Sequence, residues 1–107
     1  MIKPTQSKRF NEMLLPIFKR YPVYRAILFG SYARGEETPN SDVDLIIDSR
    51  GELININFYA LLDEVVEALQ TDVDMFEISE IQKNPEFIES VRREGIILYE
   101  RKRSRAS

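Results

Sequence analysis

Apolar residues recur along parts of this chain every three or four positions, a spacing that predicts amphipathic helices. Such helices are expected over residues 7–20, 56–69 and 86–93. Pro16 should end or bend the first of them, because proline lacks the amide donor that a helix interior needs. Gly95 closes the last one as a helix-ending glycine. The apolar stripe of the helix over 56–69 can be core or a partner face, and core is favoured in a domain this small.

Short apolar runs bounded by glycine, proline and polar residues predict strands. They lie at 23–29, 42–48, 72–78 and 96–99. Gly30 ends the first strand, a short helix can begin at Ser31 and extend to Gly35, and a polar loop follows over 36–40. The fold class expected from this mixture is α/β, with a small mixed β-sheet packed with helices.

Two aspartates interrupt the apolar pattern of the second strand. Asp42 and Asp44 are two positions apart, so on a strand their side chains share a face. Two neighbouring carboxylates repel each other unless a cation lies between them. A solvent-exposed strand would tolerate the pair, but the apolar run 45–47 that follows favours a buried strand. The pair therefore points to a cation site.

The third strand repeats the pattern at Asp72 and Asp74. If this strand lies next to the second one, Asp74 can complete a cluster of three carboxylates. Three carboxylates can hold two Mg²⁺ ions when phosphate oxygens and water fill the other positions. Asp74 is the favoured ligand because apolar residues flank it, whereas Asp72 is better explained as a turn residue between a helix and a strand.

The Gly30–Ser31 step after the first strand suits a phosphate group. Glycine lets a phosphate approach the backbone closely, and the first amides of a following helix favour an anion. The Ser31 hydroxyl can add a hydrogen bond. A glycine–serine pair after a strand is often only a turn, so this signal depends on the carboxylates that follow it.

Composition narrows the chemistry of the predicted site. The chain has neither cysteine nor histidine, so a metal here must bind to oxygen, which points to Mg²⁺ or Mn²⁺. No run of about 18 apolar residues predicts a membrane span, and residues 1–10 lack the apolar core of a signal peptide. We therefore expect a cytoplasmic protein without membrane contact.

The net charge of −3 conceals an uneven distribution. Four basic residues lie in the tail 101–107, which leaves 11 basic and 18 acidic residues in positions 1–100, a balance of −7. An acidic body does not suit nucleic-acid binding. We expect one domain over 1–100 and a disordered basic tail over 101–107. The tail can be a docking arm or simply a solvated terminus.

Three segments together carry a family resemblance: GSYARG, SDVDL and the later VDMFE. They resemble the minimal nucleotidyltransferases, a branch of the polymerase-beta-type nucleotidyltransferase superfamily, over about residues 26–99. The family pattern is G-S-x-A-R-G, a short loop, S-D-x-D-L and a third aspartate on a later strand. The matching positions are Gly30, Ser31, Ala33, Arg34, Gly35, Ser41, Asp42, Asp44, Leu45 and Asp74.

The resemblance implies transfer of AMP from ATP to a hydroxyl group, with release of pyrophosphate. Gly30 and Ser31 would hold the β- and γ-phosphates, and Asp42 and Asp44 would bind both metal ions. Asp74 would bind the catalytic metal and accept the acceptor's proton, a role that a carboxylate can fill in a chain without histidine. Arg34 can contact phosphate or acceptor, or can form an ion pair at the helix end.

The resemblance also implies a partner. Minimal nucleotidyltransferases are commonly paired with a HEPN-domain protein in a toxin–antitoxin system, where the transferase neutralises an RNase by adenylylating a tyrosine, by binding it, or both. A chain of this length has little surface to enclose an acceptor, which favours a protein acceptor in a hetero-oligomer. Two alternatives stay open: an antitoxin that acts by occlusion without catalysis, and transfer to a small molecule.

Overall fold

The structure, a computed structural model, describes residues 4–101 and the side chains of residues 8–101. The predicted basic tail lies outside the described residues, apart from Arg101. The elements, in chain order, are α1 (Pro4–Lys19), β1 (Arg25–Phe29), α2 (Ser31–Arg34), β2 (Val43–Asp48), α3 (Ile56–Leu69), β3 (Val73–Glu77), α4 (Ile78–Ile81), α5 (Pro85–Glu94) and β4 (Ile96–Glu100).

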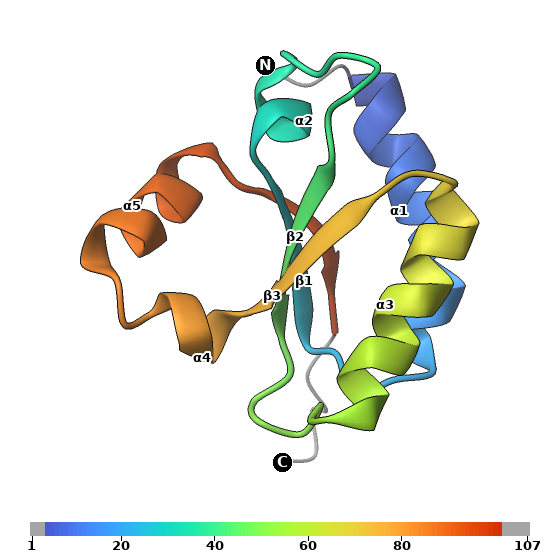
Figure 1. The fold of residues 1–107 in the computed structure, drawn as a ribbon, viewed down its shortest axis with the longest axis vertical. Coiled ribbons are helices and arrows are strands. Elements are labelled where there is room, and N and C mark those ends of the chain that lie inside the picture. The colour runs from blue at the N-terminus through green and yellow to red at the C-terminus, as the bar shows by residue number, and fades with distance from the viewer. Residues whose placement is uncertain (1–3, 102–107) are drawn as a thin grey trace.

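The four strands form one mixed sheet in the order β3-β2-β1-β4. β1 runs antiparallel to β2 and to β4, whereas β2 and β3 are parallel. Helices α1 and α3 lie on one side of the sheet, α4 and α5 lie on the other, and α2 lies at one end (Figure 1). This arrangement confirms the predicted α/β fold with a small mixed sheet.

The main hydrophobic core lies between the sheet and the helices α1 and α3. Alternate residues of β2, namely Val43, Leu45 and Ile47, are fully buried there. A smaller cluster lies on the opposite face, where Ile27 and Ile46 pack with residues of α4 and α5. The apolar stripe of α3 is core, as predicted: its members Phe58, Leu61, Leu62, Val65 and Leu69 are buried in the main cluster or packed against it.

Several details differ from the sequence-based expectations. α1 continues through Pro16 to Lys19, so Pro16 does not end the helix, and whether it bends the helix stays a prediction. α4, which begins directly after β3, was not predicted. The strand over 23–29 begins only at Arg25, because Val23 donates to the Tyr21 carbonyl in a turn at 2.7 Å.

A further difference concerns Gly95. It follows α5 with a φ of −69°, so it is not the left-handed glycine that the sequence suggested. Packing explains it instead, because a Cβ at this position would lie 2.6 Å from both Ile27 Cγ2 and the Val91 carbonyl oxygen. The start of α5 is fixed by Asn84, whose side chain accepts hydrogen bonds from the amides of Glu86 and Phe87. Among the described residues, no helix has the length and apolar character needed to cross a membrane.

Candidate functional site

The predicted site residues gather at one end of the sheet, on the face that α4 and α5 partly cover. Phe29, the last residue of β1, pairs with Asp44 of β2, and Asp44 in turn pairs with Asp74 of β3. The condition attached to Asp74, that β3 lies beside β2, is therefore met. Because β2 and β3 run parallel in register, the two carboxylates lie on neighbouring strands with side chains on the same face.

Gly30 brings the turn after β1 against this carboxylate pair. Its φ of +77° is a conformation that glycine adopts readily and other residues rarely do. A Cβ added at Gly30 would lie 2.2 Å from Asp44 Oδ2. Glycine is thus needed at this position for two independent reasons, its backbone conformation and the closeness of Asp44.

Ser31 begins the short helix α2 immediately after this contact and is half-buried. The Gly30 carbonyl accepts hydrogen bonds from the amides of Ala33 and Arg34, at 3.0 and 3.1 Å, which closes the turn of α2. The helix ends at Gly35 in the left-handed conformation, with a φ of +74°. The two glycines of the GSYARG segment therefore bracket α2, whose first residue, Ser31, directly follows the Gly30 backbone that lies against Asp44.

The surroundings of Asp44 disfavour the ionised form of its carboxyl group. Burial raises its pKa above the ordinary value, and the negative charges of Asp74 and Asp42 raise it further. The Arg34 guanidinium acts in the opposite direction and lowers the pKa of Asp44. A divalent cation between these oxygens would remove the repulsion, so the donor set suits a hard metal ion.

Asp42 lies just before β2 rather than within it, and its side chain is exposed. Its charge reaches Asp44, as the effect on the Asp44 pKa shows. Within the described part of the chain, however, no three acidic side chains are arranged closely enough to form a ready-made metal site. Asp44 and Asp74 are brought together, and Asp42 lies at the edge of the pair.

Arg34 makes the ion pairs that were considered as an alternative to ligand binding. Its Nε donates to Glu36 Oε1 at 2.9 Å, and its Nη1 donates to Glu94 Oε1 at 3.4 Å. The same positive charge also lowers the pKa of Asp44. Arg34 therefore forms ion pairs with Glu36 and Glu94 and also affects the ionisation of Asp44.

The loop between α2 and β2 is held by Ser41, a position of the SDVDL segment. The Ser41 hydroxyl accepts a hydrogen bond from the Thr38 amide at 2.8 Å, and the Ser41 amide donates to the Thr38 carbonyl at 2.9 Å. Next to this loop, the Val43 amide donates to the Asp72 carbonyl at 2.9 Å, which ties the starts of β2 and β3 together. Asp72 thus acts through its backbone, consistent with its interpretation as a turn residue.

A row of phenylalanines beside the carboxylates was not identified from the sequence. The ring centroids of Phe29 and Phe87 are 5.5 Å apart, and those of Phe87 and Phe76 are 6.2 Å apart. A hollow of about 370 Å³ is lined by residues that include Phe29 and Phe87. One signal was available in the sequence: Phe76 follows Asp74 by two positions on a strand and therefore shares its face.

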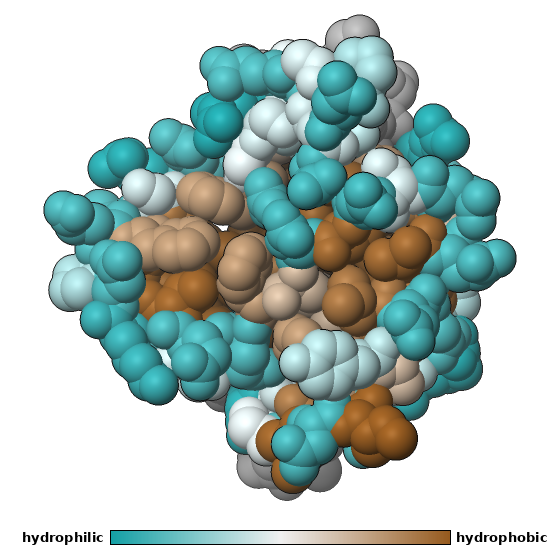
Figure 2. Space-filling view, viewed as in Figure 1, coloured by the Kyte–Doolittle hydropathy of each residue, from teal (hydrophilic) through white to brown (hydrophobic). Residues whose placement is uncertain are grey.

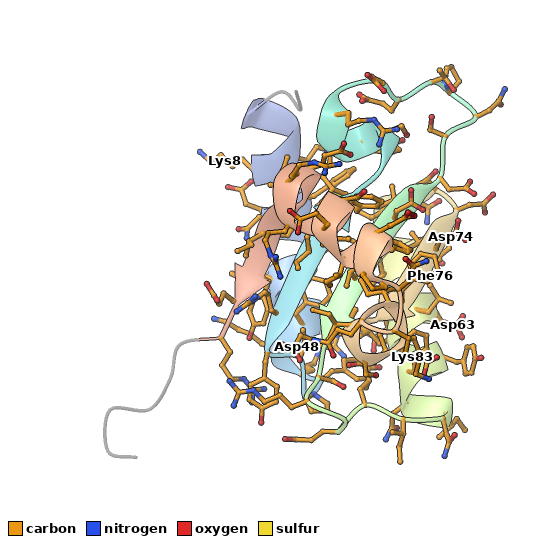
Figure 3. All side chains as sticks on the ribbon, turned by 90° about the vertical axis from the view of Figure 1, so that its left-hand side faces the viewer. Lys8, Asp48, Asp63, Asp74, Phe76 and Lys83 are labelled. Carbon is orange, nitrogen blue, oxygen red and sulfur yellow. The ribbon has the colours of Figure 1, made fainter. Side chains whose placement is uncertain are left out.

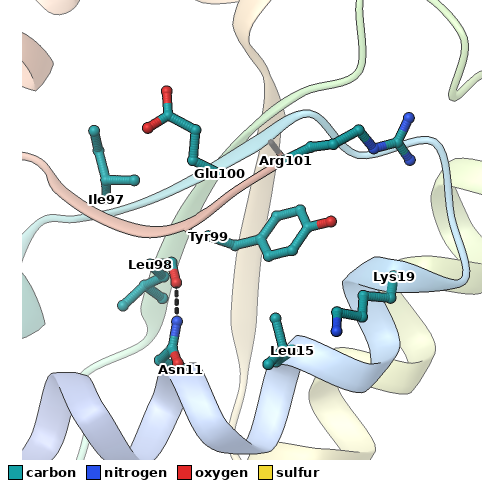
Figure 4. A pocket seen from close by; sticks show the side chains of 8 residues that line it. All are labelled: Asn11, Leu15, Lys19, Ile97, Leu98, Tyr99, Glu100 and Arg101. Carbon is teal, nitrogen blue, oxygen red and sulfur yellow. Dashed lines mark hydrogen bonds between the residues drawn. The ribbon is translucent and has the colours of Figure 1, made fainter. Parts of the chain in front are cut away.

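Another hollow, of about 600 Å³, lies between α1 and β4 (Figure 4). Leu15 and Tyr99 help to line it, and Asn11 Nδ2 donates a hydrogen bond to the Leu98 carbonyl at its floor. None of the predicted site residues lines this hollow.

The sequence matches the family described as polymerase beta, nucleotidyltransferase, over residues 12–104. The chain belongs to the polymerase beta nucleotidyltransferase family. It is accordingly a nucleotidyltransferase enzyme, and the paired carboxylates beside the Gly30 turn lie within the matched region of the nucleotidyltransferase domain.

Several curated relatives of this nucleotidyltransferase share its short length. A candidate protein adenylyltransferase of Methanocaldococcus jannaschii is 32% identical over 68 residues, which cover 64% of this chain and 73% of the relative. A second one from the same organism is 33% identical over 73 residues, or 68% of this chain and 74% of the relative. The protein adenylyltransferase MntA of Shewanella oneidensis is 37% identical over 51 residues, which span 48% of this chain but only 37% of MntA.

Solved structures confirm the nucleotidyltransferase fold. A chain in the crystal structure of a toxin–antitoxin complex with AMP-PNP has a TM-score of 0.72 and 23% identity, over 86% of this chain and 74% of that one. A chain in the structure of the tri-AMPylated Shewanella oneidensis HEPN toxin bound to its MNT antitoxin has a TM-score of 0.66 and 20% identity, over 89% of this chain and 73% of that one.

Proposed function

We propose that this chain transfers AMP from ATP to a hydroxyl group of a partner protein and acts as the antitoxin of a toxin–antitoxin pair. The observation that carries the proposal is the register pairing of Asp44 with Asp74 directly beside the Gly30 turn. Paired carboxylates next to a glycine turn supply the two features that nucleotidyl transfer needs, a cation-binding group and a place for phosphates.

In this proposal Asp42, Asp44 and Asp74 hold two Mg²⁺ ions, or Mn²⁺ in their place. Their oxygens are hard ligands. Burial and, after it, the negative charges of Asp74 and Asp42 raise the Asp44 pKa, and a divalent cation would neutralise those charges. When bound, the ions supply charge neutralisation for the triphosphate and lower the pKa of the attacking hydroxyl.

The residues of the chain then have separate tasks. Gly30 and Ser31 bind the β- and γ-phosphates, and Arg34 adds positive charge near the phosphates. The acceptor oxygen forms a bond to the α-phosphorus, while the bond from the α-phosphorus to the bridging oxygen breaks and pyrophosphate leaves. Asp74 takes the proton of the acceptor hydroxyl.

The comparisons support a protein acceptor. The S. oneidensis relative is a protein adenylyltransferase, and the structurally similar chain from that organism is found with an AMPylated HEPN toxin. We infer that the partner of the present chain is a HEPN-domain toxin and that the modified residue is a tyrosine. ATP is the proposed nucleotide, in keeping with the AMP-PNP bound in the similar complex.

One observation favours a second candidate function, an antitoxin that acts by occlusion. The three carboxylates do not form a ready-made three-ligand group among the described residues. An antitoxin that neutralises its partner by occlusion alone would not need a metal site, so its carboxylates would not have to form such a group. The acidic body of the chain, with 18 acidic residues in positions 1–100, would serve either function by docking a basic surface.

The two candidates are separated by testing neutralisation. The protein encoded by the neighbouring gene is expressed alone, with this chain, or with its Asp42→Asn/Asp44→Asn variant, and toxicity is scored by growth. Loss of protection with the variant, while the two proteins still co-purify, supports catalysis. Full protection by the variant would refute the enzymatic antitoxin and establish occlusion.

A further inference from the structure

Phe76 is an exposed aromatic residue beside the carboxylates. Phe76 is 37% exposed, whereas Val73 and Met75, which alternate with Asp74 and Phe76 along β3, are buried on the opposite face. It follows Asp74 by two positions, so both side chains project from the same face of β3 (Figure 3). β3 is also an outer strand of the sheet, so among the described residues no further strand pairs with its outer edge.

Phe76 is the last of three phenylalanine rings that contact one another beside the carboxylates. It meets Phe87 edge-on, with an interplanar angle of 70°, and Phe87 meets Phe29, which pairs with Asp44. The hollow of about 370 Å³ opens at Phe29 and Phe87. On the face shown in Figure 2, hydrophobic residues gather across the middle and again at the lower end, with hydrophilic residues around them.

The Gly30 turn and Asp74 lie on opposite sides of Asp44, so the proposed phosphate site and the proposed acceptor site are on different sides of this carboxylate. The Gly30 turn lies against Asp44 on the β1 side, and Asp74 lies on the β3 side, away from that turn. A triphosphate at Gly30 therefore approaches from β1. The acceptor hydroxyl must come to Asp74 from the side of β3, where Phe76 is the next residue on the same face.

The spacing suits one class of acceptor. Two residues along a strand are about 6.7 Å apart, and a hydroxyl hydrogen-bonded to a carboxylate lies within about 3 Å of its oxygen. Aromatic rings interact favourably with centroids about 4.5–7 Å apart. A phenolic side chain whose hydroxyl reaches Asp74 can thus place its ring on Phe76, whereas a serine or threonine hydroxyl has no ring to place there.

We propose that Phe76, supported by Phe87, binds the ring of a tyrosine acceptor while Asp74 receives its hydroxyl, so that this site selects tyrosine over aliphatic hydroxyl residues. This inference rests on the proposed function and specifies its acceptor. Phe76 is a specificity-determining residue in this scheme, and Phe87 positions it.

The test uses the acceptor protein and a variant of it in which the modified residue is replaced by serine. Phe76→Ala and Phe76→Leu should each raise KM for the acceptor protein about tenfold or more and reduce the preference for tyrosine over serine. KM for ATP should stay within about twofold. Ile97→Ala is the matched control, because Ile97 is 53% exposed on the other outer strand, β4, and should change neither quantity.

Unchanged KM and unchanged tyrosine preference in both Phe76 variants would overturn the inference. A raised KM for ATP with an unchanged KM for the acceptor would also overturn it, since the rings would then bind the nucleobase. If the wild-type protein transfers no AMP at all, the proposed function fails separately. Binding is then measured by NMR: acetyl-tyrosine amide should shift the ring signals of Phe76 and Phe87, and absence of such shifts would overturn the ring site.

Discussion

The Gly30 backbone and the Asp44 carboxylate are in direct contact, so that a Cβ at position 30 would lie 2.2 Å from Asp44 Oδ2. The proposed phosphate turn and the proposed cation ligands are therefore one structural unit, although 14 positions separate the two residues. Any side chain at position 30 must displace the Asp44 carboxylate, because its Oδ2 atom would be too close to the added Cβ. The carboxylate can give way because it can rotate.

Replacing Gly30 by alanine should greatly reduce AMP transfer but lower the free energy of unfolding only modestly. The backbone conformation of Gly30, with φ +77° and ψ −154°, costs a non-glycine residue about 1–3 kcal/mol, and the displaced Asp44 carboxylate should reduce AMP transfer by about 100-fold or more. Gly51→Ala is the matched control, because Gly51 has a φ of +79° but nothing within 4 Å of its Cβ position. Urea unfolding and transfer assays on both variants measure the two effects. Equal transfer rates in the two variants would contradict the role assigned to the contact.

Asp44→Asn should stabilise the metal-free protein and abolish its response to Mg²⁺. The raised pKa of Asp44 means that its ionised form costs stability at neutral pH. In EDTA at pH 7 the variant should melt at a higher temperature than the wild type. The difference should shrink as the pH falls towards 3.8, the ordinary value, where the wild-type carboxyl becomes protonated.

The same melting experiment tests the cation. Saturating Mg²⁺ at 100 times Kd should stabilise the wild type by about 2.7 kcal/mol and leave Asp44→Asn unchanged. Ser49 lies at the opposite end of β2 and bonds to Glu77, so Glu77→Gln serves as a control for a carboxylate lost elsewhere on the sheet. An equal Mg²⁺ response in all three proteins would exclude Asp44 as a ligand.

Arg34→Gln should raise KM for ATP about tenfold, which corresponds to 1.4 kcal/mol. The reason is the loss of positive charge beside Asp44 and the proposed phosphates. Glu94→Gln removes only the ion pair at 3.4 Å and should leave KM for ATP within about twofold. Steady-state kinetics of both variants measures this. If Glu94→Gln raises KM as much as Arg34→Gln, the effect of Arg34 is on structure and not on ATP.

Glu64 should make stability depend on pH at the junction of α1 and α3. Arg20 and Tyr21 donate to its carboxylate and lower the pKa of Glu64 below 4.5, its ordinary value. A lowered pKa contributes stability that is present above about pH 4.5 and is lost as the pH falls through the folded value. Glu64→Gln should therefore be less stable than wild type at pH 7, and the difference should decrease as the pH falls below 4.5, as measured by thermal melts. A difference that does not change with pH would point to packing instead.

Much of the site followed from local patterns. The i, i+2 spacing of Asp42 and Asp44 and the flanking apolar residues were enough to predict that Asp44 lies on a strand with Val43 and Leu45 turned to the core. The absence of histidine and cysteine was enough to predict oxygen ligands. These conclusions depend on composition and on positions close together in the chain.

Other features depend on contacts between distant segments. The register that places Asp44 opposite Asp74 is set by how α3 returns the chain to the sheet, and no periodicity specifies it. Glu94 lies 60 positions from Arg34 and becomes its partner only because α5 folds over the sheet. Phe87 joins Phe29 and Phe76 into a row for the same reason.

The most direct test is to compare ATP labelled at the α-phosphate with ATP labelled at the γ-phosphate, each incubated with this chain, Mg²⁺ and the protein encoded by the neighbouring gene. The proposed function predicts that label enters the partner only from the α-phosphate, on a tyrosine, and that Asp44→Asn and Asp74→Asn each abolish it. Label from the γ-phosphate, no label from wild type, or undiminished label with either variant would contradict the proposed function.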